Sequence, residues 1–197
     1  MCNSEPAVTV GILAGGKSTR MRRNKALLPF GGSAAIEILV KELGCFPELL
    51  ISAAEAAPYA YLGLPVVCDE NRDIGPIEGL RRLLSSARES HVFVCAADMV
   101  FLKRDMVRFL AGLISPEFDC WVVTRGDFPE PLCAVYSKRV LPVAEALVRE
   151  GQYRPRMIFG RCRTQYVPLE ETGLDPGMLR NINTPEEYRE ACRLLKE

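Results

Sequence analysis

Short strand-like runs alternate with amphipathic helical patterns along the whole chain, and this alternation restricts the fold more than any other feature. Residues 7–14, AVTVGILA, are almost continuously apolar, are rich in β-branched side chains and end at a glycine pair, which predicts a buried strand. Residues 33–44 then predict a helix, because apolar side chains recur at helical spacing between Ser33, expected as the N-cap, and Gly44, expected as the C-cap.

The same strand, loop and helix unit recurs downstream. Further strands are predicted in residues 48–53, 64–69, 91–98, 118–126 and 131–137, and further helices in residues 75–87, 103–114 and 184–197. Parallel strands joined by helical crossovers place helices on both faces of a sheet, so the expected architecture is a three-layer α/β/α sandwich with a mostly parallel sheet. Residues 151–160 are expected to be irregular and basic. No linker or repeat interrupts the pattern, which predicts a single domain over residues 1–197.

Composition argues against several classes of protein. The 25 basic residues balance the 25 acidic ones, so a broadly basic surface for nucleic acid is not expected. No apolar run approaches the ~18 residues of a membrane span, and the first residues, MCNSEPAV, do not resemble a leader peptide. The eight cysteines form no C-x-x-C pair and only one histidine could join them, which predicts reduced, structural thiols rather than a zinc site. A cytoplasmic protein that binds neither nucleic acid nor membrane is expected.

The loop after the first predicted strand gathers five cations beside a glycine pair. Ligands of open parallel sheets bind beyond the carboxyl ends of the strands, where this loop begins. The backbone N–H groups of Gly15 and Gly16 could face an anion, while Arg20 could grip phosphate oxygens and Lys25 could add a point charge. The spacing fits neither the Rossmann fingerprint nor the P-loop. The loop therefore predicts a phosphate site, and a plain tight turn with solvated cations remains the alternative.

Four segments resemble the motifs of one family, in the same order. Residues 13–32, LAGGKSTRMRRNKALLPFGG, resemble the L-A-G-G-x-x-x-R-M-G-x-x-K signature of the molybdenum cofactor guanylyltransferases, the molybdopterin-guanine dinucleotide biosynthesis protein A family. The segments DIGPIEGL, AADMVFL and NINTPEEY resemble three further motifs of that family. The resemblance implies a Rossmann-like nucleotidyltransferase fold of the glycosyltransferase-A type. It also implies Mg²⁺-dependent transfer of GMP from GTP to the molybdopterin cofactor, with release of pyrophosphate, and transient contact with proteins that make or insert that cofactor.

The resemblance also assigns roles to individual residues. Arg20, Lys25 and Asp98 would be catalytic, and Asp98 would also be the metal ligand. The nucleotide-binding residues it implies are Leu13, Ala14, Gly15, Gly16, Lys25, Ser52, Asp69, Gly75, Pro76 and Asp98. Asp69 and Asp98 each end a predicted strand, so both carboxylates are expected at one rim of the sheet, although a strand-end aspartate can also be a simple turn or cap residue.

Two departures from the family pattern leave alternatives open. Arg22 stands where the family usually has glycine, an added cation that the phosphate grip should tolerate. Ser52 stands where many members have asparagine and has fewer hydrogen-bonding groups than an amide, so the donor base is uncertain. A cytidylyl-, uridylyl- or other nucleotidyltransferase with a different phosphorylated acceptor is one alternative, and a nucleotide-binding homologue without turnover is another. Acceptor contacts are predicted for Arg154, Arg156, Asn181 and Asn183. The two arginines could equally form a solvated basic loop.

Overall fold

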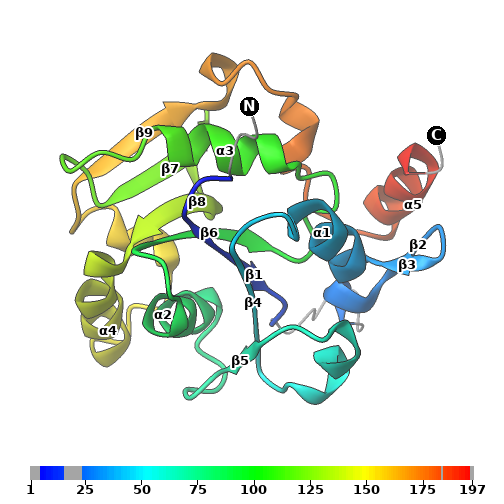
Figure 1. Ribbon diagram of the computed structural model, residues 1–197, viewed down its shortest axis with the longest axis horizontal. Helices are drawn as coiled ribbons and strands as arrows, with labels where there is room; N and C mark the ends of the chain where they lie inside the picture. Colours follow the sequence, from blue (N-terminus) through cyan, green and yellow to red (C-terminus); the bar gives the residue numbers. More distant parts are fainter. Residues whose placement is uncertain (1–4, 16–23, 183, 196–197) are drawn as a thin grey trace.

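The fold is built around one seven-stranded sheet with the strand order β5-β4-β1-β6-β8-β7-β9 (Figure 1). The computed structural model describes residues 5–15, 24–182 and 184–195. The strands are β1 (Thr9–Leu13), β4 (Glu48–Ala53), β5 (Val66–Cys68), β6 (His91–Ala96), β7 (Cys120–Arg125), β8 (Phe128–Ser137) and β9 (Thr164–Pro168). Every neighbouring pair is parallel except the two that involve β8, which runs antiparallel to both β6 and β7. The predicted, mostly parallel sheet is confirmed.

Helices cover both faces of this sheet. The helices α1 (Ala35–Leu43) and α3 (Arg104–Gly112) pack on one face, and α2 (Pro76–Ser86) and α4 (Leu141–Arg149) pack on the other (Figure 1). Side chains alternate along β6 as a pleated strand requires: Phe93 is buried with α1 and α3, whereas Val92 and Val94 are buried with α2 and α4. The predicted three-layer sandwich is therefore confirmed, and the two cores lie on opposite sides of one sheet.

The first predicted helix begins differently from the expectation. Ser33 is not its N-cap but lies in the short strand β3 (Ser33–Ala34), which pairs with β2 (Pro29–Phe30). The glycines at positions 31 and 32 both have positive φ angles, and the tight turn that they form draws Ser33 into a hairpin. The helix begins at Ala35, and the carboxylate of Glu37 accepts the N–H of Ala34 at 2.8 Å.

Helix α4 and strand β9 were missing from the sequence prediction. Helix α4 carries a proline in its first turn, where the missing N–H costs no hydrogen bond, and strand β9 lies at an edge of the sheet with a mixed polar sequence. Residues 151–160 are largely irregular, as expected, apart from one 3₁₀ helix. The 3₁₀ helices are η1 (Lys25–Leu27), η2 (Ala57–Leu62), η3 (Lys138–Val140), η4 (Pro155–Ile158), η5 (Leu169–Glu171) and η6 (Pro176–Leu179).

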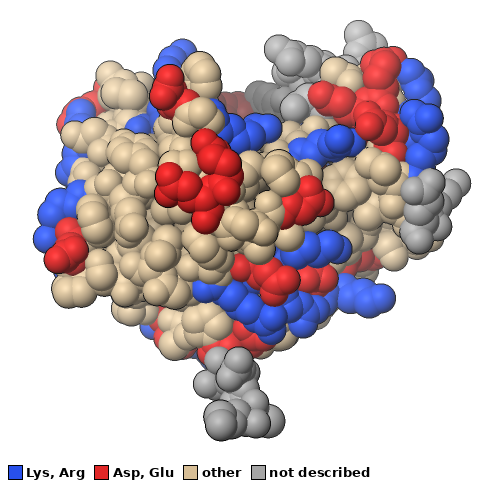
Figure 2. Space-filling view, turned by 90° about the horizontal axis from the view of Figure 1, so that it is seen from above, with Lys and Arg blue, Asp and Glu red and all other residues tan. Residues whose placement is uncertain are grey.

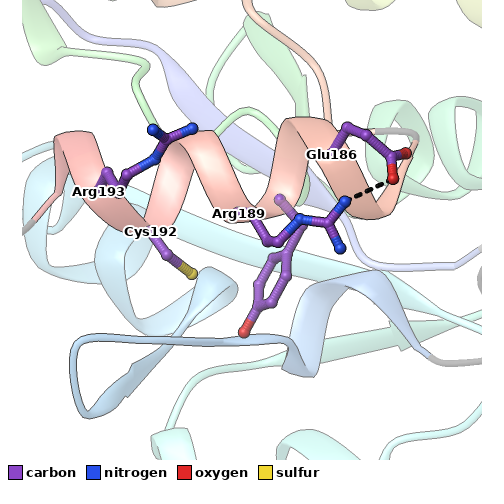
Figure 3. A pocket seen from close by; sticks show the side chains of 5 residues that line it. Glu186, Arg189, Cys192 and Arg193 are labelled. Atoms are coloured by element: carbon purple, nitrogen blue, oxygen red, sulfur yellow. Dashed lines mark hydrogen bonds and ion pairs between the residues drawn. The ribbon is translucent and has the colours of Figure 1, made fainter.

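The last helix, α5 (Pro185–Leu194), stands apart from the main layers and packs on the β2–β3 hairpin (Figure 1). Thr184 is its N-cap, as predicted, with the side-chain oxygen accepting the N–H of Glu187 at 3.2 Å. The hydroxyl of Tyr188 donates to the carbonyl of Pro29, and Figure 3 shows Cys192 on the same helix pointing toward the hairpin. Helix α5 thereby supports the β2–β3 hairpin, which follows Lys25 in the chain.

On the face shown in Figure 2, basic and acidic side chains are interspersed, without a broad area of one sign. The seven described cysteines are all free. Among the described residues, no helix combines the length and the apolar character that crossing a bilayer requires.

Candidate functional site

A cavity of about 790 Å³ opens where the loops after β1, β4 and β5 meet the start of α2. It brings together seven of the residues that the resemblance assigns to the nucleotide: Leu13, Ala14, Gly15, Ser52, Asp69, Gly75 and Pro76. The remaining lining residues are Asn24, Ala53, Ala54, Glu55, Pro58, Tyr59, Asn71, Arg72, Asp73 and Gly79. Of the other predicted residues, Gly16, Arg20 and Asn183 lie outside the described residues.

Main-chain hydrogen bonds hold the strand ends together at this cavity. The N–H of Ala14 donates to the carbonyl of Ser52 at 2.8 Å, which extends the β1–β4 pairing one residue past β1. On the other side, the N–H of Ala97 donates to the carbonyl of Leu13 at 3.0 Å. The N–H of Asp69 donates to the carbonyl of Ala53 at 3.1 Å. The backbone around Leu13 and Ala14 is therefore fixed from both sides before the glycine pair begins.

Helix α2 approaches the strands unusually closely at its first turn. A methyl group at Gly79 would lie 2.4 Å from Cδ2 of Leu13 and 2.7 Å from Oγ of Ser52, so only glycine allows this approach. Gly75 precedes the helix with a φ of +78°, a conformation that favours glycine, and Pro76 occupies the first turn. The G-P-x-x-G spacing thus places the positive end of the helix dipole at the cavity.

A lysine and a carboxylate form an ion pair beside the cavity. Nζ of Lys25 lies 2.9 Å from Oδ2 of Asp98, and the two side chains are only 22% and 16% exposed. Neither side chain lines the cavity, but both adjoin it: Asn24, the residue before Lys25, is part of the lining, and Ala97, the residue before Asp98, is bonded to Leu13. The structure therefore joins residues 73 positions apart in sequence.

Asp69 contributes a partly buried carboxylate to the cavity lining. Burial raises the pKa of Asp69, the negative charge of Glu78 raises it further, and Arg82 partly opposes both effects. A carboxylate that is poorly compensated in this way gains from an N–H or O–H donor supplied by a ligand. Its environment suits the recognition of a hydroxyl or amino group.

Glu78 is a site residue that the sequence reasoning missed. Its side chain is 1% exposed, and its carboxylate accepts hydrogen bonds from the N–H of Glu70 at 2.9 Å and from both the N–H and the amide of Asn71 at 3.1 Å. Arg81 donates two further bonds, at 3.0 and 2.9 Å. Glu78 thereby holds the loop that carries Asp69 and Asn71 along the cavity. The only sequence signal was an acidic residue inside an otherwise apolar helix start.

The charge of Glu78 predicts an acid-sensitive contribution to stability. Burial alone would raise the pKa of Glu78, but the hydrogen bonds from Arg81 and Asn71 outweigh it and lower the pKa to about 2. Because the folded-state pKa lies below the usual 4.5, the stabilisation is present above about pH 4.5 and is lost as the pH falls toward 2. Glu78→Gln should lower the free energy of unfolding by about 3 kcal/mol at pH 7 and by much less at pH 3, measured by chemical denaturation.

The control for that measurement is Glu117→Gln, which removes a charge from an exposed loop position. This variant should change the free energy of unfolding by less than about 0.5 kcal/mol at either pH. A loss in Glu78→Gln that is equally large at pH 3 and pH 7 would show that the buried charge is not its source.

The predicted acceptor arginines do not reach the cavity. Arg154 and Arg156 are exposed, and neither is among the residues that line it. Both belong to the segment around η4, whose last residue, Ile158, is buried in the core beneath α2 and α4. This segment thus packs with the α2 and α4 side of the sheet, whereas Ala26 and Ala97, the neighbours of Lys25 and Asp98, are buried on the α1 and α3 side.

Asn181 belongs to a segment that packs against the residues following Lys25 and Asp98. Its neighbour Ile182 is buried together with Leu28 and Val100, which follow Lys25 and Asp98 at short distances along the chain. Within the described part of the chain, the side-chain oxygen of Asn181 is buried without a hydrogen-bond partner. Of the three predicted acceptor residues that are described, Asn181 is therefore the one next to a residue that packs against the segments carrying Lys25 and Asp98.

Residues 10–166 match the MobA-like NTP transferase domain. The chain belongs to this family. The probable molybdenum cofactor guanylyltransferase of Carboxydothermus hydrogenoformans is 33% identical over 195 residues, which cover 96% of this chain and 98% of the relative. The molybdenum cofactor guanylyltransferase of Vibrio cholerae is 30% identical over 179 residues, which cover 89% of this chain and 87% of the relative.

A solved structure extends the MobA-like comparison to the fold. Molybdopterin-guanine dinucleotide biosynthesis protein A from Archaeoglobus fulgidus superposes with a TM-score of 0.84 at 22% identity, covering 96% of this chain and 99% of the other. The predicted family membership and the predicted nucleotidyltransferase fold are both confirmed. The matched region contains the cavity and both members of the Lys25–Asp98 pair.

Proposed function

We propose that this MobA-like protein transfers GMP from GTP to a molybdopterin cofactor, giving the guanine dinucleotide form and pyrophosphate. One observation carries the proposal: two of the four motif segments, the glycine-rich loop and the start of α2, line one cavity, and the Lys25–Asp98 pair at its border joins the first motif to the third. The names of relatives that span nearly the whole chain support the same reaction. The reaction would take place in the cytoplasm, with transient contact to proteins that make or insert the cofactor.

The reaction would depend on positioning and on charge. The main chain of residues 13–15 and the carboxylate of Asp69 would hold the nucleoside. Lys25 would face the phosphates together with Arg20, whose role is assigned from the sequence alone. An oxygen of the acceptor phosphate would attack the α-phosphorus of GTP as the bond from that phosphorus to the pyrophosphate oxygen breaks. Such a transfer needs in-line alignment and neutralisation of the developing charge more than it needs an acid or a base.

The carboxylate of Asp98 fits a magnesium ion that arrives with the nucleotide. Within the described ranges, no group of three or more His, Cys, Asp or Glu side chains could hold a metal by itself. Mg²⁺ is commonly bound by one or two carboxylates, with substrate phosphates and water as the other ligands, so a single carboxylate is sufficient. When bound, the ion would neutralise negative charge on the phosphates. Lys25 would keep the Asp98 carboxylate oriented toward this position.

The choice of base is the sharpest test of the proposal. Ser52 is 1% exposed and packs beneath Gly79, so it has little freedom to reach toward a base. We expect main-chain groups of residues 13–15 to select guanine, with a kcat/KM for GTP above that for CTP and at least about tenfold above that for ATP. The measurement is pyrophosphate release from each of the four nucleoside triphosphates with molybdopterin as acceptor, with and without Mg²⁺.

Two outcomes would contradict parts of this proposal. A kcat/KM ratio of GTP to CTP below one would replace guanylyl with cytidylyl transfer, because the smaller base would then be the one that fits beside Ser52. Nucleotide binding without pyrophosphate release from any triphosphate would instead identify a nucleotide-binding homologue that lacks turnover.

A further inference from the structure

The hydroxyl of Tyr59 contacts both ends of the segment that carries the predicted phosphate-binding cations. It donates to the carbonyl of Ala14 at 2.9 Å and accepts from the side-chain amide of Asn24 at 2.9 Å. The ring belongs to η2, is 2% exposed and is part of the core that also contains Ile12. One rigidly packed oxygen atom thereby links residue 14 to residue 24.

The bond to Ala14 also fixes the next N–H group. A trans peptide bond is planar, so the carbonyl of Ala14 and the N–H of Gly15 lie in one plane and point in opposite directions. No cis peptide bond occurs among the described residues. Because Tyr59 holds the carbonyl, it also sets the direction of the Gly15 N–H, and Gly15 lines the cavity. Gly15 has no side chain that could restrict its own backbone, so the hydrogen bond from Tyr59 is needed to limit the orientation of the preceding peptide group.

The bond to Asn24 fixes the other end. The side-chain oxygen of Asn24 accepts the N–H of Ala26 at 3.1 Å and so caps the short helix η1, which begins at Lys25. Its amide group donates to Tyr59 at the same time. Burial raises the pKa of Tyr59, although the hydrogen bond from Asn24 opposes this, so the hydroxyl keeps the proton that it donates to Ala14.

We infer that Tyr59 is a positioning residue for nucleotide binding. Its single hydroxyl holds the Gly15 N–H and the backbone that leads into Lys25 in one fixed arrangement. It does not touch the reacting phosphates; it acts through Ala14 and Asn24. The inference rests on the proposed function, because it assumes that the cavity holds a nucleoside triphosphate. Without the hydroxyl, the backbone at Ala14 and at Asn24 must become ordered when the nucleotide binds. The entropy lost in that ordering weakens binding without altering the chemical step.

The test compares Tyr59→Phe with Tyr61→Phe. Both variants remove one hydroxyl from the same 3₁₀ helix, but Tyr61 is 58% exposed and its hydroxyl interacts with Glu37 instead. By calorimetry, Tyr59→Phe should raise the Kd for GTP roughly tenfold, the effect of one to two net hydrogen bonds, and Tyr61→Phe should leave it unchanged. In turnover, the KM for GTP should rise with the Kd, while kcat stays within about twofold and the KM for molybdopterin does not change.

A second variant approaches the same link from the solvent side. Asn24 is exposed, so Asn24→Ala is expected to fold even if Tyr59→Phe does not. It should also weaken GTP binding. The loss of binding free energy in the double variant should be smaller than the sum of the losses in the two single variants, because both changes break the same linkage. Additive effects in this cycle would contradict a shared bridge.

The outcomes separate this inference from the proposed function. If the wild-type protein binds GTP and Tyr59→Phe binds it equally well, the positioning role is wrong and the proposed function stands. The same conclusion follows from Asn24→Ala if that is the variant that folds. If the wild-type protein binds none of the four nucleoside triphosphates, the proposed function fails and the inference fails with it.

Discussion

Asp98→Asn is expected to lower turnover by at least about a hundredfold and to move the Mg²⁺ requirement to much higher concentrations. Asparagine keeps the shape of the side chain but removes the anionic oxygen that would bind the ion. The change also breaks the 2.9 Å pair with Lys25, so the lysine would no longer be held toward this position. The measurement is the rate of pyrophosphate release as a function of Mg²⁺ concentration, at saturating GTP and molybdopterin.

Asp105→Asn is the matched control for this prediction. Asp105 lies on α3, its side chain is 57% exposed, and it pairs with Arg108 rather than with a site residue. Removing its charge should leave both the rate and the Mg²⁺ requirement unchanged. An Asp98→Asn enzyme with an unaltered Mg²⁺ titration would remove Asp98 from the proposed metal site.

Lys25→Ala is expected to lower kcat/KM by about a hundredfold or more while it lowers the free energy of unfolding by only about 1 kcal/mol. The ammonium group would neutralise phosphate charge that develops during transfer, and alanine leaves that charge uncompensated. The effect on stability should stay below that of breaking a fully buried pair, because Asp98 is 16% exposed and water can solvate its carboxylate once the lysine is removed. Both quantities are measurable on one preparation, by pyrophosphate release and by chemical denaturation.

Lys41→Ala provides the comparison, because Lys41 is an exposed cation on α1. It should match the wild-type protein in turnover. If Lys25→Ala turned over at the wild-type rate, or lost activity only in proportion to unfolded protein, the lysine would have a structural role instead of a catalytic one.

Much of the fold followed from local patterns. Strand β1 could be predicted because its residues are apolar almost without interruption, and α2 could be predicted because Gly75 and Pro76 mark its start. Helix α4 and the edge strand β9 were missed because their patterns are short and mixed, and each is stabilised mainly by neighbours that are distant in sequence. Ser33 was misassigned for a related reason: the turn at the glycine pair 31–32 competed with the helix cap and prevailed.

The sequence by itself determined the family, the layered fold and the segments that form the site, because motif spacing and hydrophobic period are local properties of the chain. Only the tertiary structure decided how the site is held. Tyr59 links residues 14 and 24, Glu78 supports the loop after β5, and the segment of Arg154 and Arg156 packs with the core beneath α2 and α4. Each of these facts is a contact between segments that the chain does not connect locally, and such contacts are fixed by how packed layers bring distant side chains together.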